Sequence, residues 1–111
     1  TQRLQENIRH FVKGMRQIGA PLDPNHETAI IPIEIRNEEK LGKMYQSLLD
    51  SGVAVVPVVY PVVSRNRSRF RFSVRADLTI TDLDYAIAAF ERAMRVAGFD
   101  FDQLQEDKKA A

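Results

Sequence analysis

The sequence predicts an α/β fold, specifically an α+β two-layer sandwich in which helices cover a three-stranded, mainly antiparallel sheet. Three segments carry apolar residues at spacings of three and four, as amphipathic helices do. Short apolar runs lie between them, and one run alternates strictly between apolar and polar residues, as a half-buried strand does. The predicted order is helix, strand, helix, strand, strand, helix. A chain of 111 residues accommodates one such domain around one core.

The first predicted helix runs from the amino terminus to Gly19, where a left-handed cap ends it, and Pro21 and Pro24 follow. The run at 29–35 is predicted to be a strand. Pro32 inside this run indicates an edge position or a bulge, because proline donates no hydrogen bond to a neighbouring strand. The apolar stripe of the helix consists of Leu4, Ile8, Phe11, Met15 and Ile18.

Asn37 is suited to cap a second helix, which Gly52 closes. The run at 53–60 follows and is predicted to be a buried strand, again with an internal proline, Pro57. The apolar stripe predicted for this second helix consists of Leu41, Met44, Tyr45, Leu48 and Leu49.

The run at 69–75 alternates, so its phenylalanines are predicted to face the helices and its arginines to face outward. Thr79 or Thr81 caps the last helix, and Asp82 follows Thr79 at the spacing of a capping box. Gly98 ends this helix. We predict one domain over 1–99 and a polar tail over 100–111. The apolar stripe of the last helix consists of Leu83, Ile87, Phe90, Met94 and Ala97.

Composition narrows the classes of function. The formal net charge is +1, so no overall field attracts nucleic acid or an acidic membrane, and we expect neither partner. Cysteine is absent, which excludes disulfides and thiolate chemistry. No apolar run approaches the roughly 20 residues of a spanning helix, and we expect a cytoplasmic protein. The chain begins at Thr1 with an amphipathic pattern and no signal peptide, so we expect a piece of a longer protein.

An arginine-rich segment is the main candidate for chemistry. Guanidinium groups bind carboxylates and phosphates through a planar, two-pronged fork, and a strand can hold that fork rigidly. A solvated basic face, balanced by acidic residues elsewhere in the fold, explains the same pattern. Sequence spacing leaves both interpretations open. The arginines of the segment are Arg65, Arg67, Arg69, Arg71 and Arg75.

Several of these features occur in a fixed order that resembles the carboxyl-terminal part of the α-oxoamine synthases, which share the fold of the aspartate-aminotransferase-like enzymes that use pyridoxal 5′-phosphate (PLP). The resemblance covers the chain to about Phe99. It departs from the family at Ser64, Asn66 and Leu78, where the family usually has proline, glycine and histidine. The features that carry the resemblance are Ile31-Pro32, Gly52, Tyr60-Pro61, Arg69-Phe70-Arg71 and Thr79.

The resemblance implies specific roles. Arg71 would bind the carboxylate of the amino-acid substrate. Arg69 points the same way by strand parity and is a second candidate substrate-binding residue; only the family pattern selects Arg71 for the carboxylate. Tyr60 and Pro61 would line the mouth of the active site, where the acyl thioester enters. The full-length enzyme would be a homodimeric PLP-dependent acyltransferase that condenses an amino acid with an acyl-CoA. A large PLP-binding domain, missing from this chain, would precede it.

The lysines give no reason to expect PLP in this chain alone. A PLP enzyme needs a lysine for the Schiff base, and none here follows the family's Ser/Thr-x-x-Lys pattern. Lys13, Lys40 and Lys43 lie on predicted exposed helix faces, and Lys108 and Lys109 lie in the tail. We therefore predict that this chain by itself binds no cofactor and has no catalytic residue.

His10 and His26 lack metal-ligand partners at a useful spacing, so we predict no metal site.

The alternative function is an RNA-binding or ligand-binding ferredoxin-like module. The alternation of Phe70 and Phe72 superficially resembles the RNA-binding strand of RRM domains, where such aromatics stack on bases. That strand, however, has a glycine between its aromatics, and the chain is not basic overall. Outward-facing phenylalanines would favour the RNA interpretation. A small-ligand module needs a glycine at its strand-to-helix turn, and Asn37-Glu38 offers none.

Overall fold

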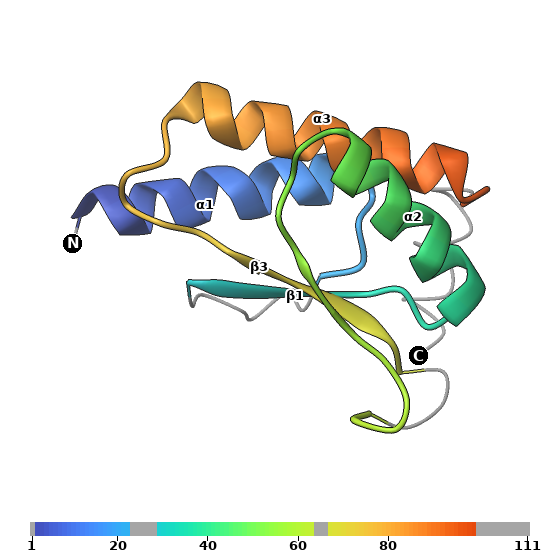
Figure 1. Cartoon of the computed structure of the whole chain (residues 1–111). Coiled ribbons are helices and arrows are strands. Elements are labelled where there is room, and N and C mark those ends of the chain that lie inside the picture. Colours follow the sequence, from blue (N-terminus) through green and yellow to red (C-terminus); the bar gives the residue numbers. More distant parts are fainter. Residues whose placement is uncertain (1, 23–28, 64–66, 100–111) are drawn as a thin grey trace.

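The computed structural model describes residues 2–22, 29–63 and 67–99. Its element order is the predicted one, with helices and strands alternating along the chain before two strands follow each other (Figure 1). The predicted α/β class and order are thus confirmed. The elements are α1 (Gln2–Gln17), β1 (Ile30–Glu34), α2 (Glu38–Asp50), β2 (Val56–Val58), β3 (Arg69–Ser73) and α3 (Ile80–Val96).

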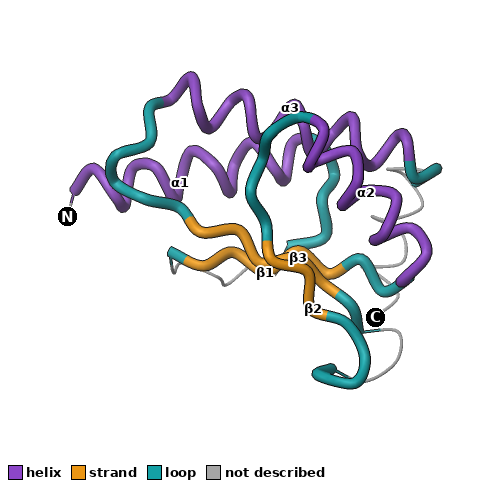
Figure 2. The backbone as a smooth tube through the Cα atoms, viewed as in Figure 1, coloured by secondary structure: helices purple, strands orange, loops and turns teal. Residues whose placement is uncertain are grey.

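The three helices lie together on one side of the sheet, which makes the two layers (Figure 2). The strand order is β1-β3-β2, and both strand pairs are antiparallel. β1 is therefore an edge strand, as Pro32 predicted. In the register of the sheet, Arg71 at the centre of β3 lies opposite Pro32 on β1 and Val56 on β2.

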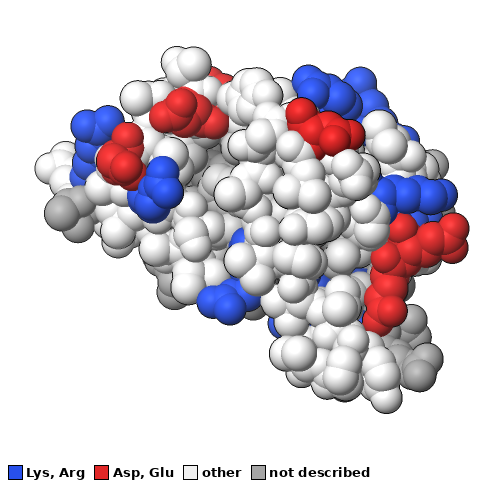
Figure 3. Space-filling view, viewed as in Figure 1, with Lys and Arg blue, Asp and Glu red and all other residues white. Residues whose placement is uncertain are grey.

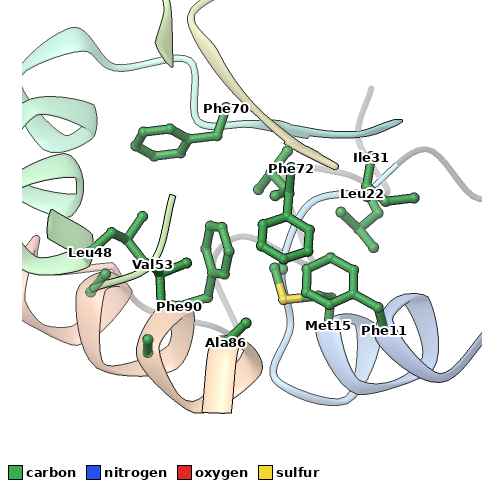
Figure 4. Packing of buried hydrophobic residues seen from close by; sticks show 14 of the residues in the cluster. Phe11, Met15, Leu22, Ile31, Leu48, Val53, Phe70, Phe72, Ala86 and Phe90 are labelled. Atoms are coloured by element: carbon green, nitrogen blue, oxygen red, sulfur yellow. The ribbon is translucent and has the colours of Figure 1, made fainter. Parts of the chain in front are cut away.

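The core forms where the phenylalanines of three elements meet between the layers (Figure 4). Phe11 of α1 stacks on Phe72 of β3 with ring centroids 4.4 Å apart. Phe90 of α3 presents its edge to Phe11, Phe70 and Phe72, at centroid distances of 6.3, 6.3 and 6.1 Å. The inward side of β3 is therefore the centre of the core, as its alternation predicted. Sequence periodicity missed that α3 also buries Ala86, Ala89 and Ala93.

Two predictions about burial are wrong. The run at 53–60 is not a buried strand: β2 covers only Val56–Val58, and Val56 is 55% exposed. β2 pairs with one neighbour only, Pro57 cannot donate a hydrogen bond, and no helix covers the outward side of this strand. Leu49 does not join the α2 stripe either and is 49% exposed. It lies on the flank of the helix, beyond the arc that meets the core.

The helix boundaries follow the predicted signals. Asn37 caps α2 by accepting a hydrogen bond from the Lys40 backbone N–H at 3.0 Å. Thr79, rather than Thr81, caps α3 and forms the complete capping box with Asp82. The three helices are each followed by a glycine with positive φ, at Gly19, Gly52 and Gly98. No helix in the described ranges is both long and apolar enough to cross a membrane.

Candidate functional site

The face of the sheet that points away from the helices is called the outer face here. Strand parity and register assign its members, because successive side chains of a strand point to opposite faces. It combines apolar residues of the two edge strands with polar residues of the central strand. Its members are Ile30, Pro32 and Glu34 of β1, Val56 and Val58 of β2, and Arg69, Arg71 and Ser73 of β3.

The carboxylate of Glu34 contacts three arginines at one end of the outer face. Arg36 Nη2 lies 3.1 Å from Glu34 Oε2, and Arg67 Nη2 lies 3.5 Å from Oε1. Arg69, the register partner of Glu34, brings its Nη2 to 3.8 Å from Oε1. Arg69 Nε also donates to the Arg67 carbonyl oxygen at 3.2 Å. Sequence reasoning missed Glu34; strand parity places it on the outer face, but its pairing depends on the register.

The arginines of the predicted cluster thus fall into different groups. Arg67 and Arg69 share Glu34, and Arg75 Nε lies 3.0 Å from Asp77 Oδ1. Asp77 balances the charge of Arg75, whereas Arg36, Arg67 and Arg69 share the one carboxylate of Glu34, so that group keeps a net positive charge. Arg65 lies outside the described residues.

Arg71 is different from its neighbours on the strand. Its side chain is exposed and, within the described part of the chain, makes no ion pair or hydrogen bond. The residues opposite it, Pro32 and Val56, carry no charge. The outer face therefore presents one guanidinium that is held at its base by a central strand and is available to an anion.

Tyr60 and Pro61 lie in the loop that follows β2, and the peptide bond between them is cis. This loop projects from the body of the molecule at the end of the sheet (Figure 1). In Figure 3 the described residues at this corner are mostly uncharged. Tyr60 is 49% exposed and Val62 is 82% exposed. The structure does not bring this pair into the ladder beside Arg71, because Val58, two residues earlier, is already opposite Arg69.

The RNA-binding alternative requires phenylalanines that face outward. Phe70 is fully buried and Phe72 is 7% exposed, and both contact Phe90 of α3. Neither ring can stack on a base. The structure therefore removes the feature on which this alternative rested.

His10, the histidine candidate that the structure describes, lies on α1 in the helical layer. His10 Nε2 of α1 is 2.6 Å from Asp84 Oδ1 of α3. The two residues are far apart in the sequence, so local patterns could not predict this contact. His26, Lys108 and Lys109 lie outside the described residues. In the described ranges, no group of three or more His, Cys, Asp or Glu side chains could hold a metal ion.

The described lysines lie on helices α1 and α2. Lys13 is exposed on α1, and Lys43 Nζ lies 3.7 Å from Glu39 Oε1 on the same helix. Lys40 is partly buried, with its Nζ 4.7 Å from the centre of the Phe99 ring. All three lie on the helical layer, on the other side of the sheet from the Arg71 guanidinium. None of these three described lysines therefore lies on the outer face beside Arg71.

Comparison with known proteins identifies the relatives of this chain. Residues 1–90 match the family model described as aminotransferase class I and II. The 8-amino-7-oxononanoate synthase of Thermoanaerobacter pseudethanolicus is 35% identical over 92 residues, which are 83% of this chain and 23% of that protein. Serine palmitoyltransferase 2 of Dictyostelium discoideum is 33% identical over 86 residues, 78% of this chain and 18% of that protein.

Solved structures agree with these relatives. A serine palmitoyltransferase from S. paucimobilis with a bound PLP–myriocin aldimine matches 87% of this chain and 25% of its own, with a TM-score of 0.80 and 26% identity. The 8-amino-7-oxononanoate synthase from Francisella tularensis has a TM-score of 0.71 over 85% of this chain and 27% of its own; its 20% identity supports the fold alone. The chain spans about a quarter of the length of the first relatives it matches.

Proposed function

The chain belongs to the aminotransferase class I and II family and matches part of the α-oxoamine synthases, and from this premise we propose that residues 1–99 are the carboxyl-terminal small domain of such an enzyme. The full-length protein would condense an amino acid with an acyl-CoA as a PLP-dependent acyltransferase. Residues 100–111 would form its polar tail. The small domain would contribute substrate contacts and would not be catalytic by itself.

The observation that carries this proposal is that the guanidinium of Arg71 has no partner among the described residues. A substrate carboxylate needs a cation that is fixed in position and not already neutralised. Arg71 meets both conditions on the outer face, whereas Arg69 is paired with Glu34. A carboxylate held in a two-pronged fork fixes the amino acid at one end, which orients its reacting bond relative to the cofactor. Arg71 is therefore the residue we assign to the substrate carboxylate, and Arg69 is a neighbour in the same wall.

The cofactor would be bound by the rest of the enzyme. PLP, when bound, supplies the electron sink for carbanion chemistry at the substrate's α-carbon. The larger part of the enzyme would provide its Schiff-base lysine and phosphate site. The positions of the lysines support this assignment of the cofactor site, because all the described lysines lie away from the outer face.

The outer face and the loop after β2 would meet that larger part. Ile30 is 40% exposed and Val56 is 55% exposed, so an uncovered sheet face here leaves apolar surface in water. Packing against the preceding domain would cover this surface and close a pocket around Arg71. Tyr60 and Pro61 would then stand at its mouth, on the path of the acyl thioester. We further propose a cytoplasmic, homodimeric enzyme.

The test uses the full-length enzyme with Arg71→Gln. A charge-assisted hydrogen bond contributes roughly 1.5–3 kcal/mol, so loss of a two-pronged contact should raise the KM for the amino acid about a hundredfold. The KM for the acyl-CoA should change far less. Arg95→Gln, which removes an arginine ion-paired with Glu91 on α3, is the matched control and should alter neither value. An unchanged amino-acid KM in a correctly folded Arg71→Gln enzyme would reject the assignment.

A further inference from the structure

Three arginines from the end of β1 and the start of β3 meet at one carboxylate. Arg36 Nε and Nη2 both lie 3.1 Å from Glu34 Oε2, and Arg67 Nη2 lies 3.5 Å from Glu34 Oε1. Arg69 Nη2 lies 3.8 Å from the same Oε1. These four residues are called the Glu34 group here. One negative charge faces three positive charges, so the group keeps an excess of two positive charges.

The backbone holds these arginines together. The carbonyl oxygen of Ser68, between Arg67 and Arg69, accepts hydrogen bonds from the backbone N–H groups of Ile35 and Arg36 at 3.0 and 3.1 Å. Arg36 has a φ of 61°, a left-handed conformation that costs free energy for a residue with a side chain. Strained backbone of this kind is concentrated at binding sites, which directs attention to what the Arg36 guanidinium can bind.

The two outer arginines keep hydrogen-bond donors for a ligand. The side chains of Arg36 and Arg67 are 56% and 53% exposed, whereas that of Glu34 is 26% exposed. A guanidinium has five N–H donors. The contacts with Glu34 use Nε and Nη2 of Arg36 and Nη2 of Arg67, so among the described residues the Nη1 groups of both have no acceptor.

The acidic side chains at the start of α2 have other contacts. Glu38 Oε1 accepts a hydrogen bond from the Tyr60 backbone N–H at 3.4 Å, and Glu39 Oε1 lies 3.7 Å from Lys43 Nζ. In the part of the chain that the structure describes, Glu34 is the one carboxylate in ionic contact with the three arginines. The positive excess of the Glu34 group therefore remains for a ligand.

This excess fits a phosphate better than a carboxylate. A phosphate monoester carries about −1.5 to −2 charges at pH 7 and has three acceptor oxygens, so it can engage two guanidinium groups at once. Arginine forks match its geometry through paired hydrogen bonds. A carboxylate has one charge and two oxygens, and one fork satisfies it. The Glu34 group thus differs from Arg71, which presents a single guanidinium.

We propose that the Glu34 group is a phosphate-binding site, in which Arg36 and Arg67 contact the nucleotide end of the acyl-CoA. This inference rests on the proposed function. Val58 and Glu34 are both opposite Arg69 in the register, so the loop after β2 leaves the sheet at the same end as the Glu34 group. The phosphates of the acyl-CoA bind at this end, and the flexible pantetheine arm carries the thioester inward. The Cα atoms of Arg69 and Arg71 lie about 7 Å apart, so the amino acid on Arg71 is close to this path.

The experiment measures dissociation constants of coenzyme A, pantetheine and inorganic phosphate for the full-length holoenzyme by titration calorimetry. Pantetheine has the thiol arm of coenzyme A and no phosphate. Arg36→Gln and Arg67→Gln should each weaken coenzyme A about tenfold, because each removes a charge-assisted partner, and should leave pantetheine unchanged. The matched control is Arg95→Gln, which removes an arginine of the helical layer and should change neither constant. Equal losses for coenzyme A and pantetheine, or no loss for either, would overturn the proposal.

Inorganic phosphate distinguishes the two sources of a phosphate group. It should compete with coenzyme A in the wild type and bind less tightly to both variants. If the variants lose inorganic phosphate but keep coenzyme A, the site serves a free phosphate and the assignment to the acyl-CoA is wrong. A wild-type measurement tests the proposal even where a variant does not fold. Rising salt should weaken coenzyme A and not pantetheine, and equal salt dependence would refute a charged contact.

Failure of this inference and failure of the proposed function give different results. If Arg36→Gln and Arg67→Gln bind coenzyme A as the wild type does, while Arg71→Gln raises the KM for the amino acid, the role of the Glu34 group is wrong and that of Arg71 stands. If Arg71→Gln leaves the KM for the amino acid unchanged, the proposed function itself is wrong, whatever the two outer arginines bind.

Discussion

Asn7 is the buried polar residue that connects α1 to the segment between β3 and α3. Its side chain is almost completely buried, and its Nδ2 donates to the carbonyl oxygens of Arg75 at 2.9 Å and Leu78 at 3.0 Å. This segment follows the strand that carries Arg71. The contact therefore holds the carboxyl-terminal end of β3 against the helical layer, and its loss should be measurable as a loss of stability.

The cost of removing this contact can be estimated from its geometry. Asn7→Ala deletes two hydrogen bonds and leaves two carbonyl groups without that partner, at about 1 kcal/mol net for each bond and more where water cannot replace it. We expect a loss of about 2–3 kcal/mol out of the roughly 5–15 kcal/mol typical of a domain. For a domain near 100 residues the melting temperature should fall by about 10 °C or more. Thermal and urea unfolding of the chain, followed by circular dichroism, measure both values.

Asn7→Asp gives a sharper version of the same test. It keeps the shape of the side chain but replaces the donor with a carboxylate that faces two carbonyl oxygens. Burial and these acceptors should raise the pKa of the introduced carboxyl in the folded state above its unfolded value of about 3.9. The variant should therefore be least stable relative to wild type at neutral pH, and the gap should narrow as the pH falls through the raised pKa and the group becomes a donor.

The control for both variants is Gln5→Ala, an exposed position on the same helix, which should change stability by no more than about 0.5 kcal/mol. An Asn7→Ala chain as stable as this control would refute the reasoning. So would an Asn7→Asp chain whose deficit does not depend on pH.

Three further predictions concern the start of α3 and the backbone at Arg36. Thr79→Ala should cost about 1 kcal/mol, since it removes the α3 cap. Hydrogen bonds from the Thr79 backbone N–H and the Thr79 side chain lower the pKa of Asp82 in the folded state. Asp82 therefore stabilises the fold at a pH above its unfolded-state pKa, and this stabilisation is lost as the pH falls through the lowered folded-state pKa. The deficit of Asp82→Asn in urea unfolding should accordingly be present at neutral pH and vanish in acid; a constant deficit would contradict this. Arg36 has a φ of 61°, where a side chain is strained, so Arg36→Gly should be more stable than Arg36→Ala by about 1 kcal/mol. Equal urea midpoints for the two would show that no strain is stored there.

Local sequence patterns were sufficient for most of the fold. The alternation at 69–75 placed Phe70 and Phe72 in the core and the arginines outside, because successive strand residues must face opposite ways. Thr79 and Asp82 marked the start of α3 for a similarly local reason. The prediction failed for Leu49 and for the run at 53–60, where burial depends on which face another element covers.

The candidate site also combines features that local sequence predicts with features that depend on the fold. Strand alternation was enough to place Arg69 and Arg71 on one face of a strand, and the family pattern singled out Arg71. Which of the two lies near a carboxylate followed only from the fold, because the register between β1 and β3 sets Glu34 opposite Arg69 and Pro32 opposite Arg71. Charge pairing across a sheet acts between residues far apart in the chain, and no local pattern encodes which of them will meet.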